Sequence, residues 1–243
     1  MKPYIFGHRG ASGYEIENTI PSFKKAVNMG AGIEADIQLT KDDKLICFHD
    51  PYLKIGNKYY SIQNFTLEEI NAINFSDNRK IPLVEDLFNT FKKQTNNIRY
   101  SFDIANRKTG LKLLNTALES IKLERMEITD RRLIVLSALR KNNELAKLVY
   151  TLREGITRIS EKTINLEKLR KLDVQTINVR CKRNIEELFK DIIDFGLRCY
   201  IWGVNSKKNM HKVVRMNYRD EIVSAIYTDY PDILLNLIME HFK

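Results

Sequence analysis

Short apolar or β-branched runs alternate along this chain with longer segments of helical periodicity. Nine runs have the composition of strands, at residues 3–7, 32–38, 44–48, 98–104, 133–137, 155–159, 175–179, 198–204 and 222–227. Apolar residues recur at three- and four-residue steps in the stretches 21–30, 83–93, 111–121, 184–196 and 231–242, which we expect to be amphipathic helices. This alternation predicts βαβ units and a parallel sheet.

The order of elements favours a single α/β domain over residues 1–243 with the fold of a TIM-like (β/α)8 barrel. Nine expected strands exceed the eight of such a barrel by one, so one is misassigned or lies outside it; the runs 155–159 and 175–179 have the weakest pattern. Residues 52–78 are polar and aromatic and follow a strand end, so we expect a short insertion after the third strand. A doubly wound sheet is less favoured, because the first turn reads GHRGASG and not G-x-G-x-x-G.

Composition limits the class of protein. Hydrophobic residues make up 43% of the 243 positions, which is typical of a folded globular chain. No apolar run approaches the roughly 20 residues that span a bilayer, and the first residues lack a signal-peptide pattern, so we expect a cytoplasmic protein without stable membrane insertion. The formal charge of +9 comes from bases spread at helical spacing among leucines, which predicts solvated helix faces and no nucleic-acid partner.

Ionisable side chains gather at the ends of the first expected strands. They are His8, Arg9, Glu34, Asp36, His49, Asp50 and Asp103. In a parallel barrel the carboxyl ends of the strands meet on one face, where such enzymes carry out their chemistry. Glu34 and Asp36 are two residues apart, so both side chains point to the same side of their strand. We therefore expect these groups to form one site.

The residue types indicate what this site does. Two neighbouring carboxylates in an apolar strand are costly to bury unless a cation compensates them, either an Arg or Lys partner or a divalent metal, for which oxygen ligands favour Mg²⁺ or Ca²⁺. Of four histidines, His8 and His49 end strands, as a general acid and a general base would. Arg9 has the planar fork that binds phosphate oxygens in pairs. Metal, arginine and two histidines together predict phosphodiester cleavage.

Several motifs extend this pattern along the chain. They are His8-Arg9-Gly10, Glu17-Asn18-Thr19, Phe23 with Ala26, Glu34-x-Asp36 followed by Leu39-Thr40-Lys41-Asp42, His49-Asp50, and the later stretches 81–86, 201–205 and 227–231. In order and spacing the chain resembles the glycerophosphodiester phosphodiesterase family. The resemblance implies a TIM-like barrel that hydrolyses a small-molecule glycerophosphodiester to glycerol 3-phosphate and an alcohol, with a divalent metal and two histidines.

By position, the resemblance also implies roles for individual residues. Glu34, Asp36 and Asp103 would bind the metal, His8 and His49 would be the catalytic acid and base, and Arg9 would contact the phosphate. Trp202 would line the glycerol or head-group pocket, although as the one tryptophan of the chain it equally fits a core position. Asp229 is expected to be a turn or helix-capping residue, because it precedes a helix that opens with proline.

The chain departs from the family pattern at two places. Ile16 stands where the family has proline, and the fourth expected strand reads Asp103-Ile104-Ala105 where the family tends to read Glu-x-Lys. Because aspartate is one methylene shorter, the metal would shift or take an intervening water. The lysine that would touch phosphate is missing, and Arg107 or Lys108 are candidates to replace it.

Two other functions fit parts of the sequence. A phospholipase D-like enzyme acting on lysophospholipid or sphingolipid would use the same chemistry, and the aromatic residues of the insertion at 52–78 would suit a lipid substrate. A non-catalytic barrel that binds anions would use the positive charge but leaves the histidines and carboxylates unexplained. For the enzyme, the attacking group is either water or the substrate's own glycerol hydroxyl, which would give a cyclic phosphate first.

Overall fold

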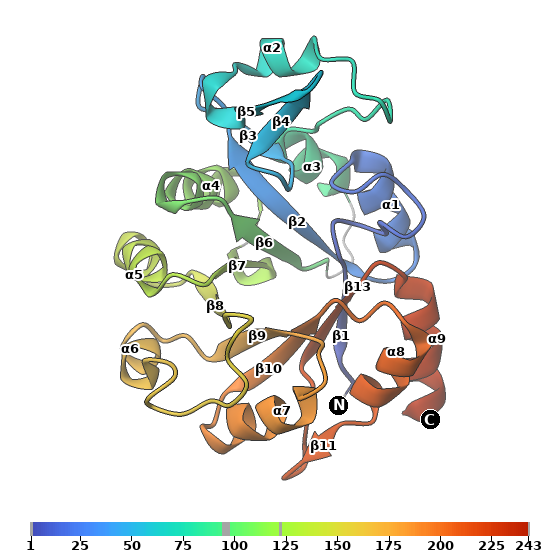
Figure 1. Cartoon of the computed structure of the whole chain (residues 1–243), viewed down its shortest axis with the longest axis vertical. Coiled ribbons are helices and arrows are strands. Elements are labelled where there is room, and N and C mark those ends of the chain that lie inside the picture. The colour runs from blue at the N-terminus through green and yellow to red at the C-terminus, as the bar shows by residue number, and fades with distance from the viewer. Residues whose placement is uncertain (1, 94–97, 122, 243) are drawn as a thin grey trace.

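A closed barrel of parallel strands forms the centre of the molecule (Figure 1). The computed structural model describes residues 2–93, 98–121 and 123–242. Within these ranges the barrel strands are β1 (Tyr4–Gly7), β2 (Gly32–Leu39), β6 (Tyr100–Ile104), β7 (Met126–Asp130), β8 (Lys147–Thr151), β9 (Thr176–Arg180), β10 (Arg198–Trp202) and β13 (Ala225–Thr228). Each strand pairs in parallel with its neighbour, and the β1–β2 pairing closes the ring. The barrel expected from the sequence is confirmed.

Helices surround the barrel and cover its outer face (Figure 1). They are α1 (Ile20–Asn28), α3 (Val84–Phe91), α4 (Arg107–Ser120), α5 (Leu133–Asn142), α6 (Leu166–Lys171), α7 (Ile185–Asp194), α8 (Lys207–Val214) and α9 (Pro231–His241). Polar side chains cap several of them; Thr19, for example, accepts a hydrogen bond from the Ser22 backbone N–H at the start of α1. The apolar faces of the helices and the outward residues of the strands form the main hydrophobic core.

Side chains alternate between this outer core and the inside of the barrel, as the two-residue period of a strand requires. In β6, Phe102 packs in the outer core, whereas its neighbour Ser101 is bonded to Tyr227 inside the barrel. A second apolar cluster fills the interior; it contains Phe6, Val149, Tyr200, Ala225 and Tyr227. The same alternation turns the polar residues at the carboxyl ends of the strands inward.

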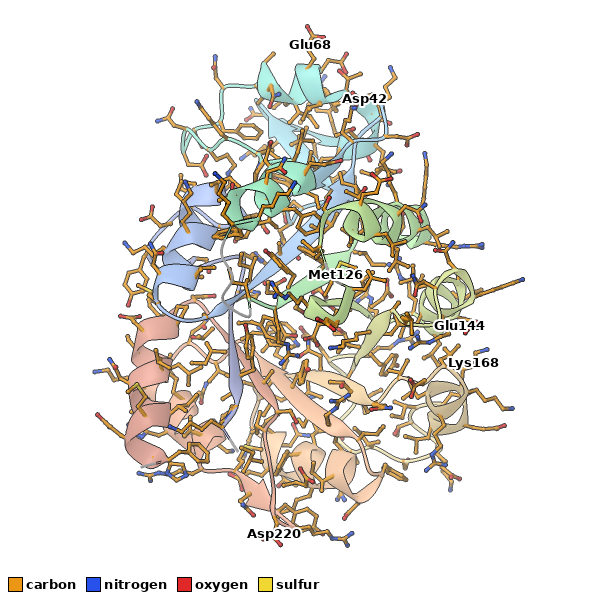
Figure 2. The ribbon with its side chains drawn as sticks, turned by 180° about the vertical axis from the view of Figure 1, so that it is seen from behind. Asp42, Glu68, Met126, Glu144, Lys168 and Asp220 are labelled. Atoms are coloured by element: carbon orange, nitrogen blue, oxygen red, sulfur yellow. The ribbon has the colours of Figure 1, made fainter. Side chains whose placement is uncertain are left out.

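The segment after β2 builds a small separate layer at one end of the molecule (Figure 1). Strand β3 (Leu45–Cys47) pairs antiparallel with β2, and β4 (Tyr52–Ile55) and β5 (Lys58–Ser61) form a hairpin followed by η1 (Ile62–Asn64) and α2 (Leu67–Asn71). These elements have their own apolar cluster, which contains Ile46, Phe48, Leu53, Ile62, Ile70 and Ile81. Figure 2 shows Asp42 and Glu68 in this layer and Asp220, in the hairpin of β11 (Asn217–Tyr218) and β12 (Glu221–Ile222), at the opposite end.

Two of the strands expected from the sequence are wrong. Residues 133–137 begin helix α5, and residues 155–159 form no strand. The strands that the structure has in that region are β7 and β8, which the sequence did not predict. The run 44–48 contains β3, which pairs antiparallel with β2 and is not a strand of the barrel. A short apolar run has no decisive periodicity, so a buried helix turn and a buried strand look alike. The weakly patterned run 175–179 is confirmed as β9.

No helix in the described ranges has both the length and the apolarity needed to cross a bilayer.

Candidate active site

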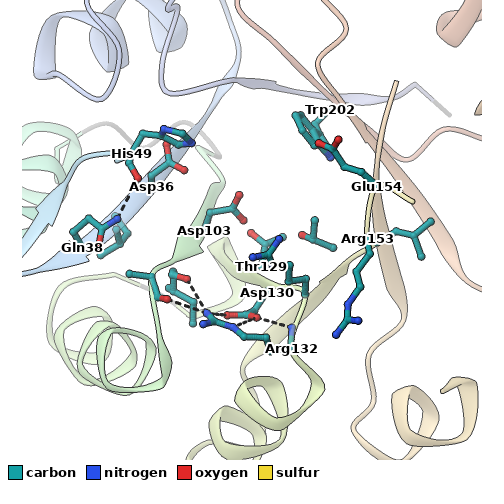
Figure 3. A pocket seen from close by; sticks show the side chains of 16 residues that line it. Asp36, Gln38, His49, Asp103, Thr129, Asp130, Arg132, Arg153, Glu154 and Trp202 are labelled. Atoms are coloured by element: carbon teal, nitrogen blue, oxygen red, sulfur yellow. Dashed lines mark hydrogen bonds and ion pairs between the residues drawn. The ribbon is translucent and has the colours of Figure 1, made fainter. Parts of the chain in front are cut away.

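The polar ends of the barrel strands line one connected depression. A cavity of about 120 Å³ is lined by His8, Arg9, Glu34, Asp36, His49, Asp103, Thr129, Thr151, Asn178, Trp202 and Tyr227. It adjoins a groove of about 430 Å³ over the ends of β6, β7 and β8, with which it shares six lining residues, among them Asp36 and Trp202. Figure 3 shows these two residues on opposite sides of the opening, with Asp103 between them. All seven residues singled out as catalytic, binding or metal-ligating lie here.

Three carboxylates form a compact cluster on β2 and β6. One oxygen each of Glu34, Asp36 and Asp103 lies within 4.8 Å of the others, and Asp36 and Asp103 are register partners. Burial and the neighbouring Asp36 raise the pKa of Glu34 to about 8 and that of Asp103 to about 6. Such a cluster repels itself unless a cation joins it, and carboxylate oxygens are the ligands of hard divalent ions. The residues present therefore fit a Mg²⁺ or Ca²⁺ ion.

The loop after β1 holds two of these carboxylates in place. Arg9 has a left-handed backbone, with φ of 54°, and its backbone N–H donates a 2.7 Å hydrogen bond to Glu34 Oε2. The Arg9 guanidinium binds Glu17 Oε2 at 2.8 Å and lies 3.0 Å from Asp36 Oδ2. Asn18 bonds Asp36 twice, through its amide to Oδ2 and through its carbonyl oxygen to the backbone N–H. Glu17 thus holds the Arg9 guanidinium, and Asn18 holds the Asp36 carboxylate, in the positions seen in the cluster.

Each histidine of the site is paired with its own carboxylate. His8 Nδ1 lies 2.8 Å from Asp229 Oδ1, and His49 Nδ1 lies 2.8 Å from Asp50 Oδ1. An ionised carboxylate only accepts, so each Nδ1 carries the proton and each Nε2 is left for a substrate. Burial alone would lower the pKa of His8. The hydrogen bond to Asp229 and the negative charge of Glu34 have a larger effect and raise this pKa to about 9. The His49 pair is far more exposed than the His8 pair.

Asp229 lies in the bend between β13 and α9, but the helix-capping role expected for it is wrong. Tyr230, not Asp229, is the N-cap of α9, and no side chain caps that helix. Asp229 instead accepts hydrogen bonds from His8, Ser12 and Asn205 and fixes the ring of His8. Asp229 and His8 are 221 positions apart, so only closure of the barrel through the β1–β13 pairing brings them together.

Three further residues that line the cavity had no role in the sequence interpretation. Thr129, Thr151 and Asn178 project inward from β7, β8 and β9, and Thr129 donates to the carbonyl oxygen of Phe102. Each of them is a polar residue near the carboxyl end of a barrel strand, and this pattern could have indicated a role in the site. For Thr129 and Thr151 it could be used only once β7 and β8 were recognised as strands. Trp202 lines the cavity and also packs against the apolar cluster inside the barrel, and the Arg180 guanidinium lies 5.2 Å from the centre of its ring.

The basic side chains nearest the groove differ from the two proposed on sequence grounds. Lys108 is ion-paired with Asp43 on the surface and does not line the cavity or the groove. Arg131, Arg132 and Arg153 line the groove instead. Arg132 binds Asp130 with two nitrogens and also donates to the carbonyl oxygen of Ala105 (Figure 3). It therefore braces the backbone that follows Asp103.

Comparison with known proteins agrees with this arrangement. The model of the glycerophosphoryl diester phosphodiesterase family matches residues 8–233. A glycerophosphodiester phosphodiesterase of Caldanaerobacter subterraneus subsp. tengcongensis is 26% identical over 249 residues, which cover 98% of each chain. The fold is similar to that of a Parabacteroides distasonis glycerophosphodiester phosphodiesterase, with a TM-score of 0.80, 22% identity and coverage of 100% of this chain and 99% of that one.

A second solved structure is similar at the same level. It is an Oleispira antarctica phosphodiesterase in complex with the product sn-glycerol-3-phosphate, with a TM-score of 0.80, 17% identity and coverage of 98% of this chain and 97% of that one. At these identities the structures establish the shared barrel, and the family match over nearly the whole chain establishes the relationship. The chain therefore belongs to the glycerophosphoryl diester phosphodiesterase family and is a phosphoric diester hydrolase.

Proposed function

We propose that this protein hydrolyses glycerophosphodiesters to sn-glycerol 3-phosphate and an alcohol, with a divalent cation held by Glu34, Asp36 and Asp103. The observation that carries the proposal is that one cavity brings this carboxylate cluster together with two histidines, each of which is bonded to an aspartate outside the cavity lining. The product bound to the similar Oleispira phosphodiesterase supports the substrate class. Either Mg²⁺ or Ca²⁺ suits an all-oxygen cluster.

The substrate phosphate would lie over the carboxylate cluster. A bound divalent cation supplies positive charge that stabilises the developing charge on the phosphate oxygens. Arg9 lies beside Asp36 in the same cavity and would add a second positive group next to the phosphate. The two ion pairs of Arg9 hold its guanidinium in one orientation, so little entropy is lost when the phosphate binds.

His8 and His49 would move the protons. One Nε2 takes the proton of the attacking hydroxyl and the other gives a proton to the oxygen of the leaving alcohol, so no unstable alkoxide forms. Asp229 and Asp50 fix the tautomer and orientation of the two rings. The attacking hydroxyl is that of water or of the substrate's glycerol; the second route passes through a cyclic phosphate, which phosphorus NMR detects in a time course.

One observation supports a second candidate, the hydrolysis of lysophospholipid. The hairpin β4–β5 directly follows His49 and Asp50, and it exposes Tyr52 at 55% and Tyr59 at 69% of their surface. Aromatic side chains at such positions would suit the interface of a micelle or membrane. Activity that rises sharply at the critical micelle concentration of lysophosphatidylcholine, and remains low on water-soluble glycerophosphodiesters, would favour this candidate.

The first test measures release of sn-glycerol 3-phosphate from glycerophosphocholine and glycerophosphoethanolamine, with Mg²⁺, Ca²⁺ or EDTA. His8→Ala and Glu34→Ala should each lower kcat/KM by about 10²-fold or more, as expected for loss of a proton-transfer group or of a metal ligand. His211→Ala, in the exposed surface of α8, is the matched control and should be fully active. Metal-independent release, or full activity of either variant, would refute the proposal.

A further inference from the structure

Two arginines in the groove beside the cavity have no carboxylate partner among the described residues. Outside the carboxylate cluster, the acids that line this groove are Asp130, which is paired with Arg132, and Glu154, which is paired with an arginine of β9. Arg131 and Arg153 also line the groove, and neither takes part in an ion pair or a side-chain hydrogen bond within the described part of the chain. Both charges therefore remain available to a ligand.

The two arginines come from neighbouring strand ends. Arg131 directly follows β7, Arg153 follows β8 by two residues, and these two strands pair in parallel. Both side chains are exposed, so rotation about their side-chain bonds can bring the guanidinium groups to a bound molecule. Figure 3 shows Arg153, together with Arg132, on the side of the opening away from His49. The positive charge thus lies along one side of the groove.

The groove is the larger of the two spaces that a phosphodiester could occupy. The cavity measures about 120 Å³ and the groove about 430 Å³. Asp36, His49 and Asp103 line both spaces, so a phosphate held by the carboxylate cluster would lie where the two meet. One arm of the diester would then enter the cavity and the other the groove. The leaving alcohol, which is the arm that varies in size among glycerophosphodiesters, fits the larger space.

The charge of the groove distinguishes between leaving alcohols. A phosphate or carboxylate on the alcohol would be attracted by two arginines, and each guanidinium can donate paired hydrogen bonds to such a group. A quaternary ammonium would lie beside two like charges, because both acids next to them are already paired. A neutral polyol would gain neither the attraction nor the repulsion.

We propose that Arg131 and Arg153 make the enzyme selective for glycerophosphodiesters whose leaving alcohol carries a negative charge; this inference rests on the proposed function. Anionic alcohols are the preferred leaving groups, neutral alcohols follow, and cationic alcohols such as choline are the poorest. Because the two guanidinium groups are exposed, the selectivity depends on ionic strength.

The test uses two substrates that differ by one phosphate, glycerophosphoinositol 4-phosphate and glycerophosphoinositol. At low salt the wild type should have a kcat/KM roughly four- to 25-fold higher for the phosphorylated substrate, as expected for two exposed charge pairs. Arg131→Gln and Arg153→Gln should each lower this ratio about two- to fivefold, and the double variant should abolish it. Both variants should leave kcat/KM for glycerophosphoinositol unchanged and raise it for glycerophosphocholine.

A matched control separates the groove from the net charge of the molecule. Arg107→Gln removes one exposed arginine at the start of α4, at the same end of the barrel but outside the cavity and the groove. It should leave the ratio between the two inositol substrates unchanged. Addition of salt to about 0.5 M should bring the wild-type ratio close to that of the double variant.

Each outcome has a distinct meaning. A wild-type ratio of one or less overturns the inference, even when glycerophosphoinositol is hydrolysed well and the proposed function holds. If Arg107→Gln lowers the ratio as much as the groove variants do, the effect belongs to the net charge and the inference is also overturned. If the groove variants lower kcat/KM equally for both inositol substrates, the arginines serve the scissile phosphate, and selectivity for the leaving alcohol is refuted. If the wild type hydrolyses none of the three diesters, the proposed function fails and the inference fails with it.

Discussion

The end of the barrel away from the site contains a buried charge network whose loss should destabilise the fold without affecting the chemistry. Arg99, just before β6, binds Glu127 of β7 and donates a 2.7 Å hydrogen bond to the hydroxyl of Tyr200. Its guanidinium also lies 4.5 Å from the centre of the Tyr4 ring. The Glu127 side chain is only 4% exposed, and Arg99, at 29%, is its charged partner.

Replacing Arg99 by methionine keeps most of the apolar volume but leaves the Glu127 carboxylate buried without its counter-charge. Removing one partner of a buried ion pair costs about 3–5 kcal/mol in free energy of unfolding. For a chain of this length each kcal/mol lowers Tm by about 2–4 °C, so Arg99→Met should lower Tm by roughly 6–20 °C. The double variant Arg99→Met/Glu127→Leu removes both charges and should recover most of that loss.

Urea unfolding followed by circular dichroism, together with thermal scans, measures these differences. The kcat of Arg99→Met below its unfolding temperature should equal that of the wild type, because the active site lies at the carboxyl ends of the strands and this network near their amino ends. A loss under 1 kcal/mol for the single variant, or a double variant less stable than the single one, would refute the reasoning.

Three further predictions follow from other contacts. Asp229→Asn should lower kcat about 10- to 100-fold with little change in KM, and Asp50→Asn should have a smaller effect because that pair is exposed. Mg²⁺ at 100 times its Kd should raise the free energy of unfolding by about 2.7 kcal/mol, measured by thermal scans, and Glu34→Ala should abolish this gain. Burial alone would raise the pKa of Asp191. The hydrogen bonds from the Arg158 guanidinium and the Ile159 backbone N–H have a larger effect and lower this pKa below its ordinary value. Its stabilisation is therefore present above the ordinary pKa of 3.8 and lost as pH falls through the lower folded value, so Asp191→Asn should reduce the urea midpoint at pH 7 and match the wild type near pH 2.

The architecture could be predicted from the sequence more reliably than the strands that compose it. Long amphipathic helices such as α7 and α9 have clear periodicity, and the alternation of elements was sufficient to indicate a barrel. The five-residue strands β7 and β8 are too short to show a period, whereas the apolar start of α5 resembles a buried strand. Their identity is fixed by hydrogen bonding to neighbouring strands, which no local pattern contains.

The residues of the site divide in the same way. His8, Glu34 and His49 belong to motifs within the first fifty residues, where a few neighbouring side chains suffice to indicate their chemistry. Asp229 and Asn178 acquire their positions from closure of the barrel, so their surroundings in the sequence suggested a turn for the first and nothing for the second. The sequence therefore predicted the site residues that lie close together in the chain, and not those that only the closed barrel brings together.

The two ends of the barrel interior have opposite chemical character, and this difference explains how one small interior can be both stable and reactive. Toward the amino ends of the strands, aromatic rings surround the paired charges of Arg99 and Glu127. Toward the carboxyl ends, the carboxylates of Glu34, Asp36 and Asp103 lie close together and repel one another. A bound cation would relieve this repulsion, so its binding energy would come from groups that folding brought together without a full counter-charge. The stable end keeps these groups in position before the ligand arrives, and preorganisation of this kind is what the proposed catalysis requires.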